Sequence, residues 1–466
     1  MVDTKGQDAL ATTAADRTLV LIVVVLASFL TPFDVSAVNL ALPSIGSEFA
    51  MDAVTLAWVA TAYLLTLAIF LVPIGRLADI HGRKRLFIYG AIVFTVASLL
   101  ISRSFSSATV IAFRALQGFG ASMMTGTGVA ILTSVYPKGE KGKAIGISVA
   151  AVYLGLSAGP FLGGILTQYL GWRSIFYVNI PIGILIAAVS ITRLKGEWAE
   201  AKGEQFDLVG SIIYGVALFT LVYGLTQVPA LNSYILVIFG AAASVAFVLW
   251  EVRSRFPVLH VGLLIRNRPF AFSNLAAFIN YSATFAVTLL MSIYLQSVRG
   301  FSPVVAGTIL ISQPLVQAVI SPAAGRLSDR IEPRIVASIG MAFTTLGLAP
   351  FVFLTQSTPL LIVVASLAVL GVGFGLFSSP NTNAVMSSVE SRFYGVASGT
   401  VATMRTIGQV VSLALVELIF ALIIGQTAIT PDSSQLFLQS SQLAFSLFTV
   451  LCFFGILASL ARGKVR

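Results

Sequence analysis

The stretch that decides the fold reads Gly-Arg-Leu-Ala-Asp at residues 75–79, and it returns 250 residues later as Gly-Arg-Leu-Ser-Asp at residues 325–329. Each copy directly follows a long apolar run. A second pair lies at nearly the same offset: Leu-Gln-Gly-Phe-Gly-Ala-Ser from residue 116 and Leu-Gly-Val-Gly-Phe-Gly-Leu from residue 370. The second half of the chain therefore repeats the first. Duplicated halves with a binding site between them are typical of secondary transporters.

The composition indicates that lipid surrounds most of the chain. Of 466 residues 57% are hydrophobic and 10% charged, and the mean hydropathy is +0.96, whereas a soluble globular chain carries about 25% charge. The apolar runs are long enough to cross about 30 Å of hydrocarbon as helices. We predict fourteen such spans, near residues 18–42, 54–74, 86–104, 108–133, 144–168, 175–193, 207–227, 233–250, 270–298, 303–323, 335–354, 360–386, 395–424 and 441–460.

The spans predict an all-α integral membrane protein with two six-helix bundles and two inserted helices. The connections between spans are too short to hold a sizeable soluble domain. We expect a cytoplasmic N-terminal tail, a first bundle, an insert with its flanking connections, a second bundle and a cytoplasmic C-terminal tail, at residues 1–17, 18–193, 194–269, 270–460 and 461–466.

The basic residues predict the orientation. An even number of spans places both ends of the chain on one side. Among 28 Lys and Arg, Arg103, Arg173 and Arg299 fall in connections on the far side, Arg114 and Arg405 fall inside spans, and the others lie on the side of the termini. The positive-inside rule then places both termini in the cytoplasm of a multi-pass protein of the cell membrane. The net charge of +10 is explained by topology, so we expect no nucleic-acid partner.

The reactive residue types are too sparse for an enzyme. Cys452 is the only cysteine, and His81 and His260 are the only histidines, so we expect no disulfide framework, metal site or cofactor. No nucleophile–base pair or phosphate-binding loop stands out. We expect a monomer whose partners are a small-molecule substrate, protons and the lipid bilayer.

Two features predict moving parts. Gly75 and Gly82 can supply the backbone angles of a tight reversal after the second span, where Asp79 can pair with Arg83 or sit at a helix N-terminus. The two Gly-Arg-Leu-x-Asp loops could latch the halves together and release as the halves rock. The residues we assign to gating in these loops are Gly75, Asp79, Arg83, Gly325 and Asp329.

The fifth span predicts close helix packing and a bend. Gly155, Gly159 and Gly163 recur every four residues, so they form one smooth face on a helix. Pro160 removes a backbone hydrogen bond and kinks the helix. Packing explains part of this pattern, and a kinked helix with a glycine face can also slide or bend.

Ionisable residues inside spans are the sharpest functional signal, because each is expensive in lipid. Asp34 lies 16 residues into its span, about 24 Å along a helix, and Arg114 lies at a similar depth. The two could form a structural ion pair, or Asp34 could exchange a proton with the help of Arg114. Glu417 could snorkel to the far surface, or it could act as a second proton and cation site facing a cavity. We interpret Arg405 as structural.

Polar residues inside spans are candidates for cavity lining, although hydrogen bonding between helices would also explain most of them. We assign to a substrate cavity Asp34, Asn39, Gln117, Asn280, Gln296, Gln313, Gln317, Gln409 and Glu417.

Together these motifs resemble the major facilitator superfamily, and more narrowly its fourteen-helix drug/proton antiporter branch, over nearly the whole chain. Residues 75–85 resemble its cytoplasmic motif between helices 2 and 3, and residues 113–121 resemble a helix 4 motif whose arginine, here Arg114, is implicated in proton transfer. Residues 155–164, 34–43 and 172–183 are similar to its helix 5, helix 1 and helix 5–6 motifs, with Ser36 where threonine is usual. The resemblance implies alternating access and export in exchange for protons.

We therefore predict a proton-driven exporter of amphipathic, cationic drugs or toxic compounds. Asp34 would be the main proton site, assisted by Arg114, and Glu417 would add negative potential. One alternative is a proton-coupled exporter of a single metabolite such as an amino acid, peptide or siderophore. Another is a membrane sensor that keeps the transporter fold without transport, which would suit a chain lacking Asp34 or the helix 5 glycines.

Overall fold

The computed structural model describes residues 14–137, 140–194, 196–328, 330–390, 394–425, 427–430 and 433–463. Every regular element in these ranges is a helix, and fourteen segments are long and apolar enough to span a membrane, which confirms the predicted number. The helices are α1 (Ala14–Glu48), α2 (Ala53–His81), α3 (Arg83–Ser102), α4 (Ser107–Val135), α5 (Lys141–Leu170), α6 (Arg173–Arg193), α7 (Leu208–Thr226), α8 (Leu231–Arg253), α9 (Val261–Arg266), α10 (Arg268–Thr284), α11 (Val287–Ile293), η2 (Tyr294–Val298), α12 (Pro303–Leu310), α13 (Ser312–Ser328), α14 (Pro333–Leu348), η3 (Ala349–Phe353), α15 (Leu360–Ser387), α16 (Tyr394–Ile423) and α17 (Ser434–Ala461).

The helix ends follow local sequence rules. Asp52 caps α2 by accepting a hydrogen bond from the Thr55 amide, and Ser106 and Thr109 form a capping box at the start of α4. Gly82 separates α2 from α3 with φ 121°, a backbone angle that favours glycine. Gly75 lies inside α2 and Gly325 inside α13, so our prediction that Gly75 helps to form the turn is wrong: the apolar helix continues past it.

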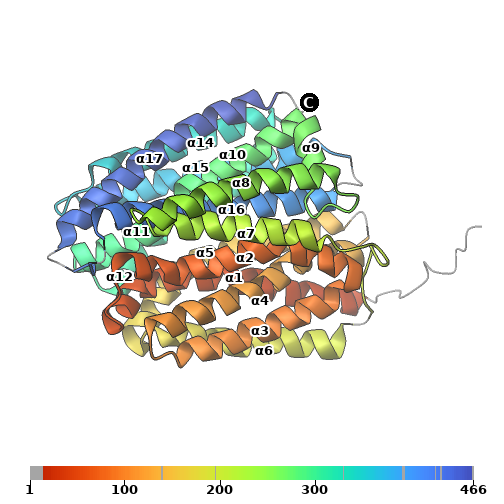
Figure 1. The fold of residues 1–466 in the computed structure, drawn as a ribbon, viewed down its shortest axis with the longest axis horizontal. Helices are drawn as coiled ribbons and strands as arrows, with labels where there is room; N and C mark the ends of the chain where they lie inside the picture. The colour runs from red at the N-terminus through yellow and green to blue at the C-terminus, as the bar shows by residue number, and fades with distance from the viewer. Residues whose placement is uncertain are drawn as a thin grey trace, which may run out of the picture.

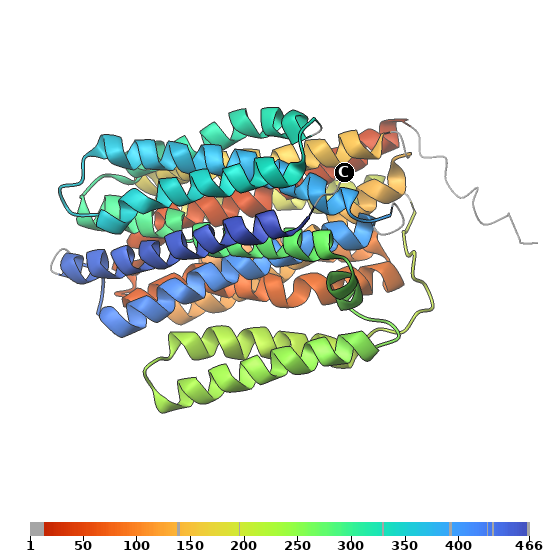
Figure 2. The same ribbon diagram turned by 90° about the horizontal axis from the view of Figure 1, so that it is seen from above.

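The two halves of the chain form two groups of packed helices. In Figure 1 the first group, α1 to α6 (red to yellow), lies below the second group, α10 to α17 (green to blue), with α7 and α8 across the join. Figure 2 shows α7 and α8 as a separate pair on one side of the bundle. They pack on each other, and α7 also contacts α2 and α16, one helix from each half.

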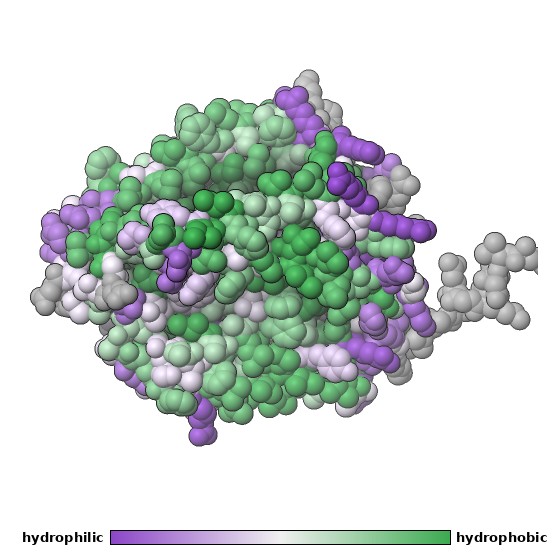
Figure 3. Space-filling view, viewed as in Figure 1, coloured by the Kyte–Doolittle hydropathy of each residue, from purple (hydrophilic) through white to green (hydrophobic). Residues whose placement is uncertain are grey.

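An apolar belt surrounds the helices. Hydrophobic side chains cover the middle of the face in Figure 3, and hydrophilic ones gather toward its two ends. This pattern fits a bilayer. We call the end that holds the start of α1, the α2–α3 turn and the end of α17 the basic end, and we call the other end the opposite end.

One set of contacts between the halves lies toward the opposite end. The Ser292 hydroxyl donates to the Asn39 carbonyl at 2.7 Å, and Gln296 Nε2 donates to the Leu40 carbonyl at 3.0 Å. Helices α5 and α12 touch where a Cβ on Gly307 would approach the Pro160 carbonyl oxygen to 2.2 Å. These contacts join the two halves on the side of the cavity that faces the opposite end.

Candidate functional site

A cavity of about 90 Å³ lies between the two halves. Helices α1 and α5 supply one wall, and α10 to α13, α15 and α16 supply the other. Four of the predicted cavity residues line it, Asn39, Gln313, Gln317 and Gln409. The remaining lining residues are Val35, Ser36, Tyr153, Leu156, Pro160, Tyr281, Thr284, Phe285, Thr288, Leu310, Pro314 and Phe374.

Asp34 and Arg114 form a buried ion pair next to this cavity, in the first half. Arg114 Nη1 lies 2.5 Å from Asp34 Oδ2, and the side chains are 1% and 0% exposed. Asp34 Oδ1 accepts from Gln117 Nε2 at 3.1 Å and from Asn179 Nδ2 at 2.6 Å. The carboxylate therefore joins α1 to α4 and α6. Asp34 and Gln117 lie in this network and not among the residues that line the cavity.

Arg114 has partners besides Asp34. Its Nε donates to the Val59 carbonyl at 3.0 Å, and its Nη1 donates to Gln117 Oε1 at 2.6 Å. The guanidinium carbon lies 4.3 Å from the centroid of the Tyr63 ring. A cation over an aromatic face is stabilised electrostatically. The guanidinium would thus keep neutral partners if Asp34 lost its charge.

Glu417 lies at the contact between α16 and α2. The Thr61 hydroxyl donates to Glu417 Oε1, which links the two halves. Glu417 is 0% exposed, and its Oε2 has no hydrogen-bond partner among the described residues. It therefore neither reaches the surface nor lines the cavity in this conformation.

Two further predicted cavity residues lie elsewhere. Gln296 lies at the opposite end, where it bonds the Leu40 carbonyl and the Ser292 hydroxyl, both at 3.0 Å. Asn280 on α10 is 0% exposed, and neither of its side-chain polar atoms has a partner among the described residues. Gln296 therefore links the two halves by a hydrogen bond.

The glycine face of α5 packs on α1. A Cβ on Gly155 would meet the Phe29 carbonyl oxygen at 2.4 Å, one on Gly159 would meet Ser36 Cβ at 2.5 Å, and one on Gly163 would meet Ala37 Cα at 2.7 Å. This is the close helix contact that the four-residue spacing predicts. Ser36 lines the cavity on one side of this contact and Pro160 on the other.

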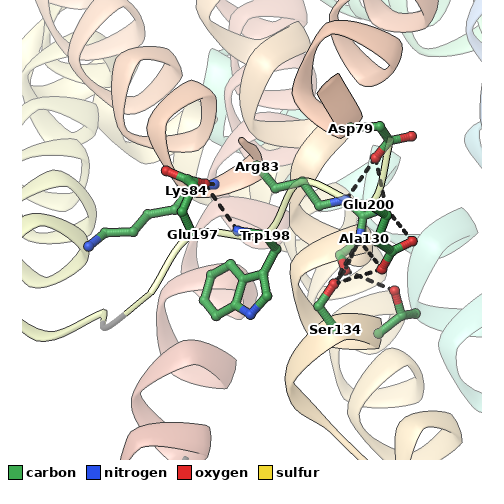
Figure 4. A network of polar contacts seen from close by, with 9 residues as sticks. Asp79, Arg83, Lys84, Ala130, Ser134, Glu197, Trp198 and Glu200 are labelled. Carbon is green, nitrogen blue, oxygen red and sulfur yellow. Dashed lines mark hydrogen bonds and ion pairs between the residues drawn. The ribbon is translucent and has the colours of Figure 1, made fainter. Parts of the chain in front are cut away.

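The α2–α3 turn is held by the connection that follows α6 (Figure 4). Arg83 Nε donates to Asp79 Oδ1 at 2.8 Å, its Nη1 donates to Glu200 Oε1 at 2.7 Å, and the same nitrogen donates to the Ser134 hydroxyl at 2.7 Å. Asp79 does pair with Arg83. Glu200 lies in the connection of residues 194–206, so the network joins this connection to α2, α3 and α4.

Further bonds extend this clamp along the connection. The Arg83 amide donates to the Trp198 carbonyl at 2.9 Å, and the Ala201 amide donates to the Asp79 carbonyl at 2.9 Å. The Lys84 amide donates to Glu197 Oε1 at 2.8 Å, and Arg76 pairs with Glu204. The turn is therefore enclosed by three glutamates. We define residues 197–204 as the linker clamp.

The described residues do not form the predicted latch between the two Gly-Arg-Leu-x-Asp loops. The first loop bonds to the linker clamp and α4, and Gly325 lies inside α13 against Ser379. Asp329 falls outside the described residues. Sequence reasoning missed the linker clamp, although three acidic residues in one connection and a run of basic residues in the first loop were a visible signal of complementary charge.

The second half holds its own buried cation at the basic end. Arg462 follows α17, and its Nη1 donates to Asn381 Oδ1 at 3.1 Å and to the Ser273 hydroxyl at 3.3 Å. Burial lowers the pKa of Arg462 to about 10, against the effect of the Glu332 charge. The contacts tie α17 to α10 and α15. Among the described residues no group of His, Cys, Asp and Glu could hold a metal ion.

Comparison with known proteins places these features in a family. The sequence model of the Major Facilitator Superfamily matches residues 24–413. The chain is 30% identical to the riboflavin transporter RibZ of Clostridioides difficile, over 94% of this chain and 96% of that protein. It is 32% identical to the multidrug resistance protein Stp of Mycobacterium tuberculosis, over 86% and 76% of the two chains. In fold it is similar to a bacterial homolog of the lysosomal transporter Spinster in an inward-facing, unoccupied conformation, with a TM-score of 0.69, 16% identity and 97% and 98% coverage.

Proposed function

The chain belongs to the Major Facilitator Superfamily, and from that premise we propose that it exports amphipathic compounds in exchange for protons by alternating access. The observation that carries the proposal is the buried Asp34–Arg114 pair beside the cavity between the halves. Relatives that confer multidrug or antibiotic resistance support export of such compounds.

Asp34 is suited to exchange a proton because its partners can reorganise without it. On protonation Asp34 would release Arg114, which keeps the Val59 carbonyl, Gln117 Oε1 and the Tyr63 ring. Asp34 shares α1 with the lining residues Ser36 and Asn39. A change at the ion pair therefore moves the same helix that forms the cavity wall, which couples proton exchange to substrate binding.

Glu417 is suited to link a second protonation event to closure of the opposite end. A buried carboxylate without a cation is expensive, so contact between α2 and α16 at Thr61 is most stable when Glu417 is neutral. Loss of that proton would push the halves apart at the opposite end. Opening would then give Glu417 access to water from that side.

The proposal also covers the orientation in the membrane, the division of the chain into bundles and the oligomeric state. The excess of Lys and Arg at the basic end favours a cytoplasmic location for both termini in the cell membrane. We keep the predicted bundle boundaries at residues 18–193 and 270–460 and the insert at 194–269, and we propose a monomer, because the cavity is formed within one chain.

A second candidate function is transport of one defined compound. The identity of 30% to a riboflavin transporter over 94% of this chain supports this candidate. A single accepted compound among many offered would favour it over broad drug export.

Transport by purified protein in proteoliposomes tests the proposal. We would impose a pH gradient, supply riboflavin or the cationic dye ethidium, and follow proton movement with a trapped pH-sensitive dye. We expect wild type to move one probe only with the gradient, and Asp34→Asn to abolish that movement. Asp52→Asn is the matched control, because asparagine also caps a helix well and Asp52 caps α2. Gradient-driven transport that survives Asp34→Asn but not Glu417→Gln would move the main proton site to Glu417, and transport that needs no gradient would refute proton coupling.

A further inference from the structure

The polar groups of the central cavity are neutral. Four primary amides line it, from Asn39, Gln313, Gln317 and Gln409, and the described residues around it include no acidic or basic side chain. Hydroxyl groups of Ser36, Thr284 and Thr288 and two tyrosines complete the polar lining. A site for a cation in a low-dielectric interior needs a counter-charge, and this lining does not supply one.

The amides are free to bind a ligand. Asn39 is 3% exposed and its Oδ1 has no hydrogen-bond partner in the described structure. The side chains of Gln313, Gln317 and Gln409 make no hydrogen bond to any described residue. Each amide offers one acceptor and two donor hydrogens. The side chains of Asn39 and Gln317 are buried and those of Gln313 and Gln409 are half-buried, and a buried amide is unfavourable until its polar atoms are paired. The lining therefore matches a ligand that presents both donors and acceptors, as amide and imide groups do.

Aromatic side chains shape the rest of the wall. Phe285, Phe374, Tyr281 and Tyr153 line the cavity, and the rings of Tyr281 and Phe374 meet edge to face with centroids 5.9 Å apart. Ring faces and edges favour flat aromatic partners. A flat ring system with polar edges would contact the rings and the amides together.

The surrounding charges act against cations. The Asp34 charge is balanced by Arg114, and Glu417 is bonded to Thr61 away from the cavity. Arg405 lies four residues before Gln409, so it lies on the same face of α16. It is half-buried and makes no hydrogen bond or ion pair with the described residues. Arg405 therefore adds a positive charge to the face of α16 that carries Gln409.

We infer that this cavity binds an uncharged, flat aromatic molecule with several amide- or imide-type groups and selects against cations. The inference rests on the proposed transport function and replaces the expectation of cationic substrates. The cavity of about 90 Å³ is smaller than the usual ligand site of about 300–1,000 Å³, so it must widen to hold such a ligand.

Equilibrium binding without a pH gradient tests the inference on the full chain in detergent. The probes are riboflavin, which is uncharged and carries an imide, and ethidium, a flat aromatic of similar size with a permanent positive charge. We expect riboflavin to bind wild type at least about tenfold more tightly than ethidium. Gln317→Leu should weaken riboflavin about fivefold to tenfold, the loss of about one hydrogen bond. Gln317→Glu should strengthen ethidium about tenfold, because it adds the missing counter-charge.

Controls keep the outcomes distinct. Gln227→Leu removes an exposed glutamine outside the cavity and should leave both affinities unchanged. Gln409→Leu and Gln409→Glu repeat the test if the Gln317 variants fail to fold. Wild type that binds ethidium as tightly as riboflavin, or that binds neither probe, overturns the inference. Riboflavin binding without gradient-driven transport would support the cavity chemistry and refute the proton coupling, and gradient-driven transport of ethidium alone would do the reverse.

Discussion

Replacing Asp34 with asparagine should destabilise the protein. The size of the effect depends on the remaining partners of Arg114. The change removes the carboxylate 2.5 Å from a guanidinium that is 1% exposed. Breaking a buried ion pair by removing one partner costs about 3–5 kcal/mol. Because Arg114 keeps Val59, Gln117 and Tyr63, we expect the lower end of that range, about 3 kcal/mol.

The expected shift in melting temperature follows from chain length. The entropy of unfolding is about 2.1 cal/mol/K per residue, so a chain of 466 residues loses roughly 1 °C for each kcal/mol. Asp34→Asn should therefore lower the melting temperature in detergent by about 3 °C. Arg114→Met alone should lower it similarly, because it leaves the Asp34 carboxylate without its cation. The double variant should be more stable than the sum of the two single changes, by about 2–3 kcal/mol.

The melting temperatures of the four proteins, followed by tryptophan fluorescence, give the coupling energy directly. Asp52→Asn should melt close to wild type, because asparagine caps α2 as aspartate does. Additive effects of the two single changes would refute the reasoning, because they would mean that Asp34 carries no charge that Arg114 balances. An unchanged melting temperature for Asp34→Asn would refute it equally.

Two further perturbations test the moving parts. Glu200→Gln weakens the linker clamp at a side chain that is 67% exposed. We expect trypsin to cleave after Lys202 about threefold faster than in wild type, because the lost exposed ion pair is worth about 0.5–1 kcal/mol, and we expect no change for the control Glu140→Gln. An equal cleavage rate in the two variants would mean that the clamp is not held by Arg83. Gly307→Val places side-chain atoms against the Pro160 carbonyl, 2.2 Å from a Cβ, and should separate the halves at the opposite end. An impermeant maleimide should then label Ser292→Cys, which replaces a buried residue at this contact, faster in a Cys452→Ser background than it does with Gly146→Val, whose Cβ meets nothing within 4 Å. Equal labelling would mean that α5 and α12 separate regardless of this contact.

The spans could be predicted from the sequence because lipid leaves few alternatives. All fourteen apolar runs are helical over most of their length. The break in the ninth span could not be predicted in this way. Helices α10 and α11 are separate there, and the freed Ala286 amide donates to the Ser412 hydroxyl of α16 at 3.0 Å. That partner is distant in sequence, so local patterns do not reveal it.

Contacts within the site could be predicted where they depend on the depth of two residues in the membrane. They could not be predicted where they depend on how the chain packs or where a connection runs. Asp34 and Arg114 meet because both lie at similar depth on neighbouring helices. Asn179 was not singled out, because its bond to Asp34 depends on how α6 packs against α1. Glu200 was missed for the same reason, since the clamp depends on where a connection of low regularity runs after α6.

The two halves have diverged in what they contribute, although they share one fold. The ion pair of Asp34 and Arg114 lies wholly in the first half, whereas three of the four cavity amides, Gln313, Gln317 and Gln409, come from the second. Asn39 is the exception, and it lies on α1, five residues after Asp34. A change in the charge of Asp34 can therefore reach the ligand through α1 alone. Under the proposed mechanism, this separation would let the amides of the second half change with the compound carried while the proton exchange of the first half stayed the same. One fold could then serve different compounds, and the relatives of this chain are named for riboflavin and for multidrug resistance.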